Sequence, residues 1–216
     1  MSLAAGAAAV DLAQRQRDRL PLAMQRAQEK LAGLAPSGEA TPLLKASQKA
    51  KTVAQRVIWL QRAASAWARP MEALSACRAG CSHCCQIPVT ISLIEARLLG
   101  RASGRAPSVP RRSLRVADHA QAENLSEMER QLQTGPLTPC PFLRADRCTV
   151  YEARPVACRT LLNLDDDDLL CRHSGGGSSQ VPYADATKLK AFALMAQADT
   201  QYADIRDFFP SMRDGL

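Results

Sequence analysis

The sequence predicts a mainly α-helical protein, in which a small helical domain is organised around a cysteine-rich metal site and follows an N-terminal helical arm. Ala, Leu, Arg and Gln dominate long stretches, and aromatic residues make up only 4% of the chain. Straight-chain side chains lose little freedom on a helix, so this composition favours helix over strand. The 216 residues, 46% of them hydrophobic, suffice for one core with an appended segment. We therefore expect an arm at residues 1–70 and a metal-binding domain at residues 71–216.

The arm is predicted to contain two helices, Ala7–Leu34 and Thr41–Arg69. Pro36 and Gly38 separate them, because both residue types interrupt a helical pattern. In the second helix, apolar residues that include Leu60 recur at helical spacing, so one of its faces must pack against another element.

The expected domain begins with four closely spaced cysteines between Pro70 and Pro88. We expect a short helix over Ile91–Leu99, an exposed loop rich in Gly, Pro, Ser and Arg over Gly100–Arg112, and a polar helix over Leu114–Gln133.

Residues 139–151 predict a short hairpin or an irregular cysteine loop with its apolar side chains turned inward. These side chains are Phe142, Leu143, Val150 and Tyr151. The acidic run Asp165–Asp168 is expected to be a solvated loop and Gly175–Ser179 a flexible stretch, so the region around Cys171 is expected to be mobile. A last helix is expected over Ala184–Phe208.

Charge is distributed unevenly along the chain. Residues 1–113 carry 17 basic and 6 acidic side chains, whereas residues 114–216 carry 11 and 15. No aromatic side chains interleave with the basic ones, so solvated helix faces are favoured over a nucleic-acid site, and the expected partner is another protein or a small-molecule substrate. Residues 1–10 lack the features of a secretory signal and no run reaches transmembrane length, so we expect a cytoplasmic protein without a membrane partner.

The strongest signal in the sequence is Cys77-x3-Cys81-x2-Cys84-Cys85, which places four thiols within nine residues. On a helix, these four positions would lie within an arc of about 100°. Thiolates so close together repel one another and oxidise unless a cation neutralises them, which favours a bound metal over free thiols, buried small side chains or disulfides.

Three further cysteines, Cys140, Cys148 and Cys158, are flanked by prolines that fix the backbone and are expected to complete the coordination. Cys171 is an eighth candidate ligand. Eight thiols exceed one tetrahedral zinc site, so either two sites exist, or one cluster takes four thiols and the others are supporting or catalytic. His83 and His173 are minor candidates as nitrogen ligands.

Three blocks of the sequence together resemble a known family. They are Cys77-x3-Cys81-x2-Cys84-Cys85, then Pro139-Cys-Pro-Phe-Leu143, then Cys148-Thr-Val-Tyr-Glu-Ala-Arg-Pro-Val-Ala-Cys-Arg159. This order strongly resembles the YkgJ-type cysteine-cluster family of zinc- or iron-chelating domains, over roughly residues 77–159. The resemblance implies metal binding by those seven cysteines. Flagellin lysine methylases look similar in this module and are associated with a [4Fe–4S] centre, which favours iron–sulfur over zinc.

Two observations leave an enzyme as an alternative. The spacing of Cys77, Cys81 and Cys84 also resembles that of radical S-adenosylmethionine enzymes, so an open metal position could bind S-adenosylmethionine for methyl transfer or redox chemistry. Arg154 and Arg159 could bind a carboxylate or phosphate, balance the charge of a thiolate cluster, or form ion pairs within the fold. The main hypothesis is a protein that holds an iron–sulfur cluster, iron or zinc. A third alternative is an interaction module that zinc holds together and whose basic arm binds the partner.

Overall fold

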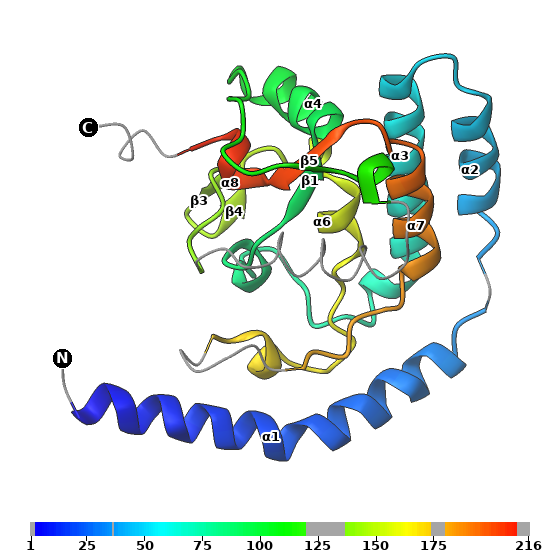
Figure 1. Ribbon diagram of the computed structural model, residues 1–216. Coiled ribbons are helices and arrows are strands. Elements are labelled where there is room, and N and C mark those ends of the chain that lie inside the picture. The colour runs from blue at the N-terminus through cyan, green and yellow to red at the C-terminus, as the bar shows by residue number, and fades with distance from the viewer. Residues whose placement is uncertain (1–2, 36, 120–136, 174–179, 211–216) are drawn as a thin grey trace.

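The computed structural model describes residues 3–35, 37–119, 137–173 and 180–210 (Figure 1). It confirms the mainly α-helical class. The helices are α1 (Leu3–Ala32), α2 (Ala40–Lys49), α3 (Val53–Glu72), α4 (Leu93–Ser103), α6 (Val156–Thr160), α7 (Thr187–Met195) and α8 (Ile205–Phe208). Short 3-10 helices are η1 (His83–Cys85), η2 (Val116–His119), η3 (Tyr151–Ala153) and η4 (Leu169–Cys171). The strands are β1 (Thr90–Ser92), β2 (Leu114–Arg115), β3 (Leu143–Arg144), β4 (Arg147–Cys148) and β5 (Gln201–Asp204).

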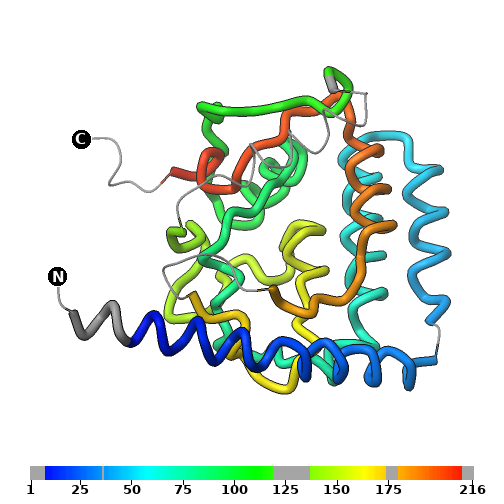
Figure 2. The backbone as a smooth tube through the Cα atoms, turned by 60° about the horizontal axis from the view of Figure 1, so that its bottom comes forward, coloured from blue at the N-terminus to red at the C-terminus, as the bar shows by residue number. Residues whose placement is uncertain are grey.

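Helix α1 forms as the sequence predicts and runs along one side of the molecule (Figures 1 and 2), where its Ala27 shares an apolar cluster with Ala68 and Met71 of α3. Ala23 and Ala27 are buried on its inner face. Between α1 and the rest of the molecule lies the segment that follows α6, which includes the acidic run. The arm is therefore in contact with the segment that leads to Cys171.

The single helix predicted over Thr41–Arg69 is wrong, because the chain breaks into α2 and α3. Ala50 is extended, and the Thr52 side chain caps α3 by accepting a hydrogen bond from the Gln55 amide at 3.2 Å. The break lets α2 fold back on α3, where its leucines pack on the cluster that contains Leu60. Helix α3 also runs two residues past Pro70 and so extends beyond its predicted end.

The core of the sheet is β5, which pairs antiparallel with β1 on one side and β2 on the other. Ile91 therefore lies in a strand opposite Ala203, and the helix predicted to start there begins at Leu93 instead. Ser92 and Glu95 form a reciprocal capping box at its start. Its end at Ser103 shortens the loop predicted from Gly100.

The long helix predicted over Ala184–Phe208 is also wrong, because the chain forms α7, β5 and α8 in succession. The Asp204 side chain explains the last change of direction. It accepts hydrogen bonds from the Arg206 amide at the start of α8 and from the Val89 amide next to β1. Helix α7 packs against α3 through Leu189.

The helix predicted over Leu114–Gln133 is wrong at its start, where β2 pairs with β5 and η2 follows; residues 120–133 lie outside the described ranges. The predicted hairpin is confirmed as β3 and β4. Its two-residue turn has Ala145 and Asp146 at positive φ, as in a type I′ turn. Within the described residues, no helix is long and apolar enough to cross a membrane. The division of the chain at residue 70 stays a prediction.

Candidate metal centre

Seven of the eight cysteines line one cavity of about 630 Å³. They are Cys77, Cys81, Cys84, Cys85, Cys140, Cys148 and Cys158. Four parts of the chain bring them together: the segment after α3, the 3-10 helix η1, the hairpin β3–β4 with the residues just before it, and α6. None of the eight cysteines forms a disulfide, and each is partly buried.

The segment with the four close cysteines is irregular, so the single helical face considered above does not form. Only His83–Cys85 is helical, as one 3-10 turn, and Gly80 has a φ of 90°, which turns the chain before it. The Cys81 sulfur accepts a hydrogen bond from the backbone of His83. Irregular backbone thus presents the four thiols to the cavity without stacking them on one helix face.

The hairpin and the residues just before it bring Cys148 and Cys140 to the same cavity. The Cys140 amide donates to the Cys85 carbonyl at 2.7 Å, which attaches the hairpin to the end of η1. The Cys140 sulfur accepts a bond from the backbone of Phe142, and that of Cys148 accepts one from Val150. Peptide N–H donors of this kind stabilise a thiolate, which is the state that binds metal.

Cys158 is presented by α6, and Glu95 of α4 fixes where α6 begins. The buried Glu95 carboxylate accepts a hydrogen bond from the Val156 amide at 2.9 Å, in addition to its bond with Ser92. Burial raises the pKa of Glu95. One buried carboxyl group thereby connects the start of α4 to the start of the helix that carries Cys158.

Cys171 lies outside the cavity lining, but it is held close to the cysteines of the first block. The Asn163 amide nitrogen Nδ2 donates to the Cys171 sulfur at 3.3 Å, and the Asn163 backbone N–H donates to the Cys77 sulfur at 3.5 Å. Asn163 is buried and is also bonded to Asp167. The buried Asn163 amide thus contacts Cys171, and the expected mobility of this region stays a prediction.

The expectation of a solvated acidic run is wrong for Asp165, which α1 covers, whereas Asp166 is exposed as expected. Asp165 is fully buried and forms a two-point ion pair with Arg19, with distances of 2.6 and 3.0 Å. Lys30 contacts Asp166 at 2.9 Å and donates to the carbonyls of Leu164 and Asp165. The basic arm and the acidic run thus neutralise each other, and Gly175–Ser179 lies outside the described ranges.

The thiols differ in how readily they ionise. Burial raises the pKa of Cys140 to about 11 and that of Cys171 to about 12. The pKa of Cys85 is lowered to about 7, mainly by a hydrogen bond with Cys84 and also by the charge of Arg154. Cys85 is therefore the thiol best suited to be an anion at neutral pH.

The two arginines of the predicted site have different surroundings. Arg159 bonds to the Ser65 hydroxyl at 2.6 Å and to backbone carbonyls, including that of Arg154. Arg154 lies over the Tyr151 ring at 3.5 Å from its centroid. Tyr151 is 53% exposed, so its predicted inward position is wrong, and it supports Arg154 at the surface instead.

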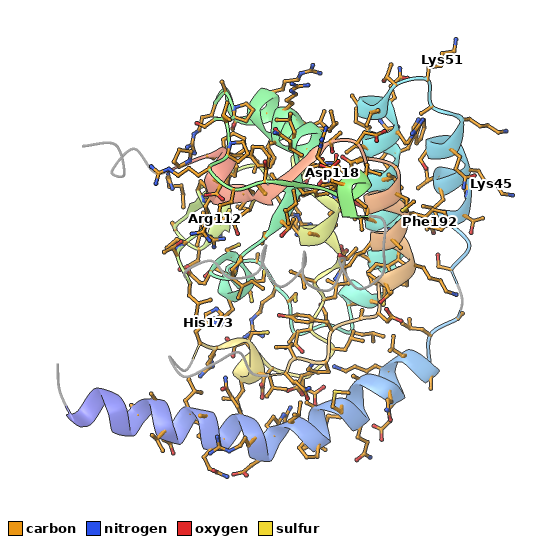
Figure 3. The ribbon with its side chains drawn as sticks, viewed as in Figure 1. Lys45, Lys51, Arg112, Asp118, His173 and Phe192 are labelled. Atoms are coloured by element: carbon orange, nitrogen blue, oxygen red, sulfur yellow. The ribbon has the colours of Figure 1, made fainter. Side chains whose placement is uncertain are left out.

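The histidines surround the first cysteine block without converging on it. His83 Nε2 shares a hydrogen bond of 2.9 Å with Asp168. His173, labelled in Figure 3 above α1, shares one of 3.0 Å with the His83 carbonyl. The His119 side chain lies outside what the structure describes. Both described imidazoles thus connect η1 to the segment around Cys171.

The residues present fit a thiolate-bound metal by type and number. In the described part of the chain, no three His, Cys, Asp or Glu side chains stand close enough together to hold one ion. A cysteine, however, can move its sulfur between staggered χ1 positions without moving the backbone. Four thiolates in a tetrahedral arrangement suit zinc and iron. Coordination by the thiols that line the cavity would therefore require side-chain rotation.

Two residues near the thiols carried no recognisable sequence signal. Asn163 is one, and Tyr183 is the other: burial raises the pKa of Tyr183, and so do four neighbouring thiols. These thiols are Cys171, Cys84, Cys77 and Cys81. Charge complementarity between the basic arm and Asp165–Asp168 was the one available signal for the contact with α1.

Comparison with known proteins gives one family match. Residues 76–175 match the family model "CxxCxxCC: Putative zinc- or iron-chelating domain". No curated protein and no solved structure matches the chain significantly. The matched range begins one residue before Cys77 and includes all eight cysteines.

Proposed function

We propose that this protein binds metal through its clustered cysteine thiolates, because residues 76–175 match the model of a family described as a putative zinc- or iron-chelating domain. The observation that carries the proposal is the gathering of seven cysteines around one cavity from four separate segments. Metal coordination requires several thiols to lie close together, whereas free thiols have no such requirement. The proposed metal is either iron, bound as an iron–sulfur cluster or as ions, or zinc.

The test is elemental analysis of protein purified without oxygen. Iron with acid-labile sulfide and a broad visible absorption would support an iron–sulfur centre, and colourless protein with stoichiometric zinc would support thiolate-bound ions. The Cys81→Ser and Cys158→Ser variants should each lose metal. A folded wild-type protein that takes up neither zinc nor iron would contradict the proposal.

A second candidate, binding of an anionic small molecule beside the metal, is supported by the size and charge of the cavity. A volume of about 630 Å³ lies within the range of small-molecule pockets. Arg78, Arg147 and Arg154 line it, and none of the three has a carboxylate partner within the described residues. Guanidinium groups bind carboxylate and phosphate with two parallel hydrogen bonds.

Calorimetry of the metal-loaded protein tests this candidate with inorganic phosphate and with S-adenosylmethionine, which carries a carboxylate. The Arg147→Gln variant should bind the accepted probe at least tenfold more weakly and keep its metal. Arg101→Gln, a change at an exposed position of α4, is the matched control. If neither probe binds, the cavity serves the metal alone.

A further inference from the structure

The segment before α7 pairs with the segment that carries Asn163. Asn163 and Tyr183 stand opposite each other in an isolated antiparallel β-bridge. Two backbone hydrogen bonds of 3.0 Å, one on each side of this pair, hold the bridge. The side chains of two directly opposed residues lie on the same face of the paired strands. The Tyr183 side chain therefore projects to the same side as the Asn163 amide.

That side of the bridge carries Cys171. The Asn163 side chain donates to the Cys171 sulfur at 3.3 Å, which fixes the direction in which the pair points. The half-buried Tyr183 ring follows this direction. Burial raises the pKa of Tyr183, and the charges of nearby thiols raise it further, with Cys171 first among them. The register of the bridge and the electrostatics thus agree that the Tyr183 phenol lies near Cys171.

The Tyr183 hydroxyl is available as a donor, because it forms no hydrogen bond with the residues that the structure describes. By contrast, the Tyr202 hydroxyl donates to the Leu194 carbonyl at 3.3 Å. A phenol can rotate its proton toward a nearby acceptor. A neutral thiol accepts hydrogen bonds weakly, whereas a bond to an ionised acceptor is roughly twice as strong as one between neutral groups. The hydroxyl therefore gains a good partner when a neighbouring thiol becomes a thiolate.

Cys171 is the thiol that most needs a further donor. It lies three residues after the acidic run Asp165–Asp168, and its own amide donates to the Asp168 carbonyl at 2.9 Å. Within the described ranges, the Asn163 side chain is the one donor to its sulfur. Donors around a metal ligand orient it and offset its negative charge. A second donor at Cys171 would therefore favour its thiolate form.

We propose that Tyr183 is a positioning residue of the metal centre, whose hydroxyl donates a hydrogen bond to the Cys171 sulfur when Cys171 binds metal as a thiolate. This inference rests on the proposed function. The thiol proton leaves to the solvent as the ion binds, and the phenol proton stays on its oxygen, so Tyr183 is not itself a ligand. Asn163 and Tyr183 then act together, since one β-bridge holds both donors beside the same sulfur.

Competition of the full chain with a calibrated zinc chelator tests the proposal. Tyr183→Phe keeps the ring and removes only the hydroxyl, so zinc should bind about tenfold more weakly. The unfolding midpoint of the metal-free variant should equal that of wild type, because the hydroxyl has no hydrogen bond to lose among the described residues. Tyr151→Phe makes the same change on an exposed ring and should alter neither quantity.

Two results of this experiment would overturn the inference. One is equal zinc affinity in Tyr183→Phe and wild type. The other is a lowered midpoint of the metal-free variant, which would show that the hydroxyl serves the fold and not the metal. Wild type that binds neither zinc nor iron would instead reject the proposed function itself.

A double-variant cycle tests the choice of Cys171 as the acceptor. Cys171→Ala leaves seven thiols, so zinc binding can still be measured in this background. There, Tyr183→Phe should change zinc affinity by less than about twofold, because the acceptor of its hydrogen bond is already gone. A loss of about tenfold in the Cys171→Ala background would contradict the assignment to Cys171.

A spectroscopic measurement with Co²⁺ reads the thiolates directly. Cobalt bound to thiolates absorbs by charge transfer from sulfur, and a hydrogen bond to the sulfur raises the energy of that transition. Tyr183→Phe should therefore move the band to longer wavelength, and Tyr151→Phe should not. An unchanged band in Tyr183→Phe would overturn the inference. A phenolate-to-iron band in wild type loaded with Fe³⁺ that Tyr183→Phe abolishes would also overturn it, because Tyr183 would then be a ligand.

Discussion

At the residue scale, Asn163 contacts two of the candidate metal ligands, Cys77 through its backbone N–H and Cys171 through its side chain. Its Nδ2 donates to Cys171 and to the Asp167 carbonyl at 2.9 Å, and its Oδ1 accepts from the Asp165 amide at 2.9 Å. Every polar atom of this buried amide is therefore used. A polar side chain placed in this way orients metal ligands and tunes their charge.

The Asn163→Asp variant should weaken zinc binding by the cysteines by about 10–100-fold. Aspartate keeps the shape and the acceptor, but it removes the Nδ2 donor and sets a negative charge against the Cys171 thiolate. Competition with a calibrated chelator measures the affinity. Gln55→Glu makes the same amide-to-acid change at an exposed position of α3 and should have no effect. Equal zinc affinity in Asn163→Asp and wild type would argue against a role for this amide.

The sequence identified the cysteines but could not identify their neighbours. Cysteine is rare enough for four in nine residues to be informative, and prolines around Cys140 and Cys158 supported the further ligands. A single asparagine or tyrosine, such as Asn163 or Tyr183, carries no comparable pattern. Its importance arises from burial and orientation, which only the packed structure determines.

At the element scale, Glu95 couples α4 to α6 and thereby helps place Cys158. The Glu95→Ala variant should lower the free energy of unfolding by about 2–4 kcal/mol, because it leaves the backbone amides of Ser92 and Val156 without the carboxylate that accepts their hydrogen bonds. Chemical denaturation of the metal-free protein measures this change. Glu29→Ala, at an exposed position of α1, should stay within about 0.5 kcal/mol of wild type. Similar losses for both variants would contradict the proposed coupling.

The ion pair between α1 and the acidic run should control access to Cys171. Arg19→Ala leaves the fully buried Asp165 without its two-point partner, so the segment that carries Cys171 should open more often. In metal-free protein, we expect alkylation of Cys171 to accelerate about tenfold or more, while that of Cys148 is unchanged. Arg17→Ala removes an exposed arginine of the same helix and is the control. Unchanged alkylation of Cys171 in Arg19→Ala would mean that α1 does not hold this segment.

The type of an element could be predicted where the local sequence pattern determines it. It could not be predicted where pairing with a distant strand determines it. The hairpin and α1 formed as expected, because turn chemistry and helix propensity are local. The predictions failed at Ile91, Leu114 and Gln201, where three short segments distant in sequence pair as one sheet. Their helical composition is outweighed by backbone pairing and by burial of residues such as Ala203.

At the scale of the whole molecule, the basic and acidic halves of the sequence meet within one chain. Arg19, Arg26 and Lys30 of α1 face Asp165 and Asp166, so part of the positive charge is neutralised internally. Other lysines stay at the surface, such as Lys45 and Lys51, which point away from the body of the protein (Figure 3). The charge asymmetry of the sequence therefore serves contacts within the protein as well as its outer surface.

Metal should also contribute to the stability of the whole fold, because the cysteines that line the cavity come from segments far apart in the sequence. Ions that bind only the folded arrangement stabilise it by about 4 kcal/mol at a free concentration a thousand times the dissociation constant. Thermal denaturation should show a clearly higher midpoint for zinc-loaded protein than for protein treated with chelator.

The difference between the two midpoints should shrink as the pH falls, because protons compete with zinc for thiols whose pKa burial has raised, such as Cys140 and Cys171. Magnesium, which prefers oxygen ligands, is the control ion and should leave the midpoint unchanged. Equal midpoints with and without zinc would show that the fold does not depend on its thiols for support.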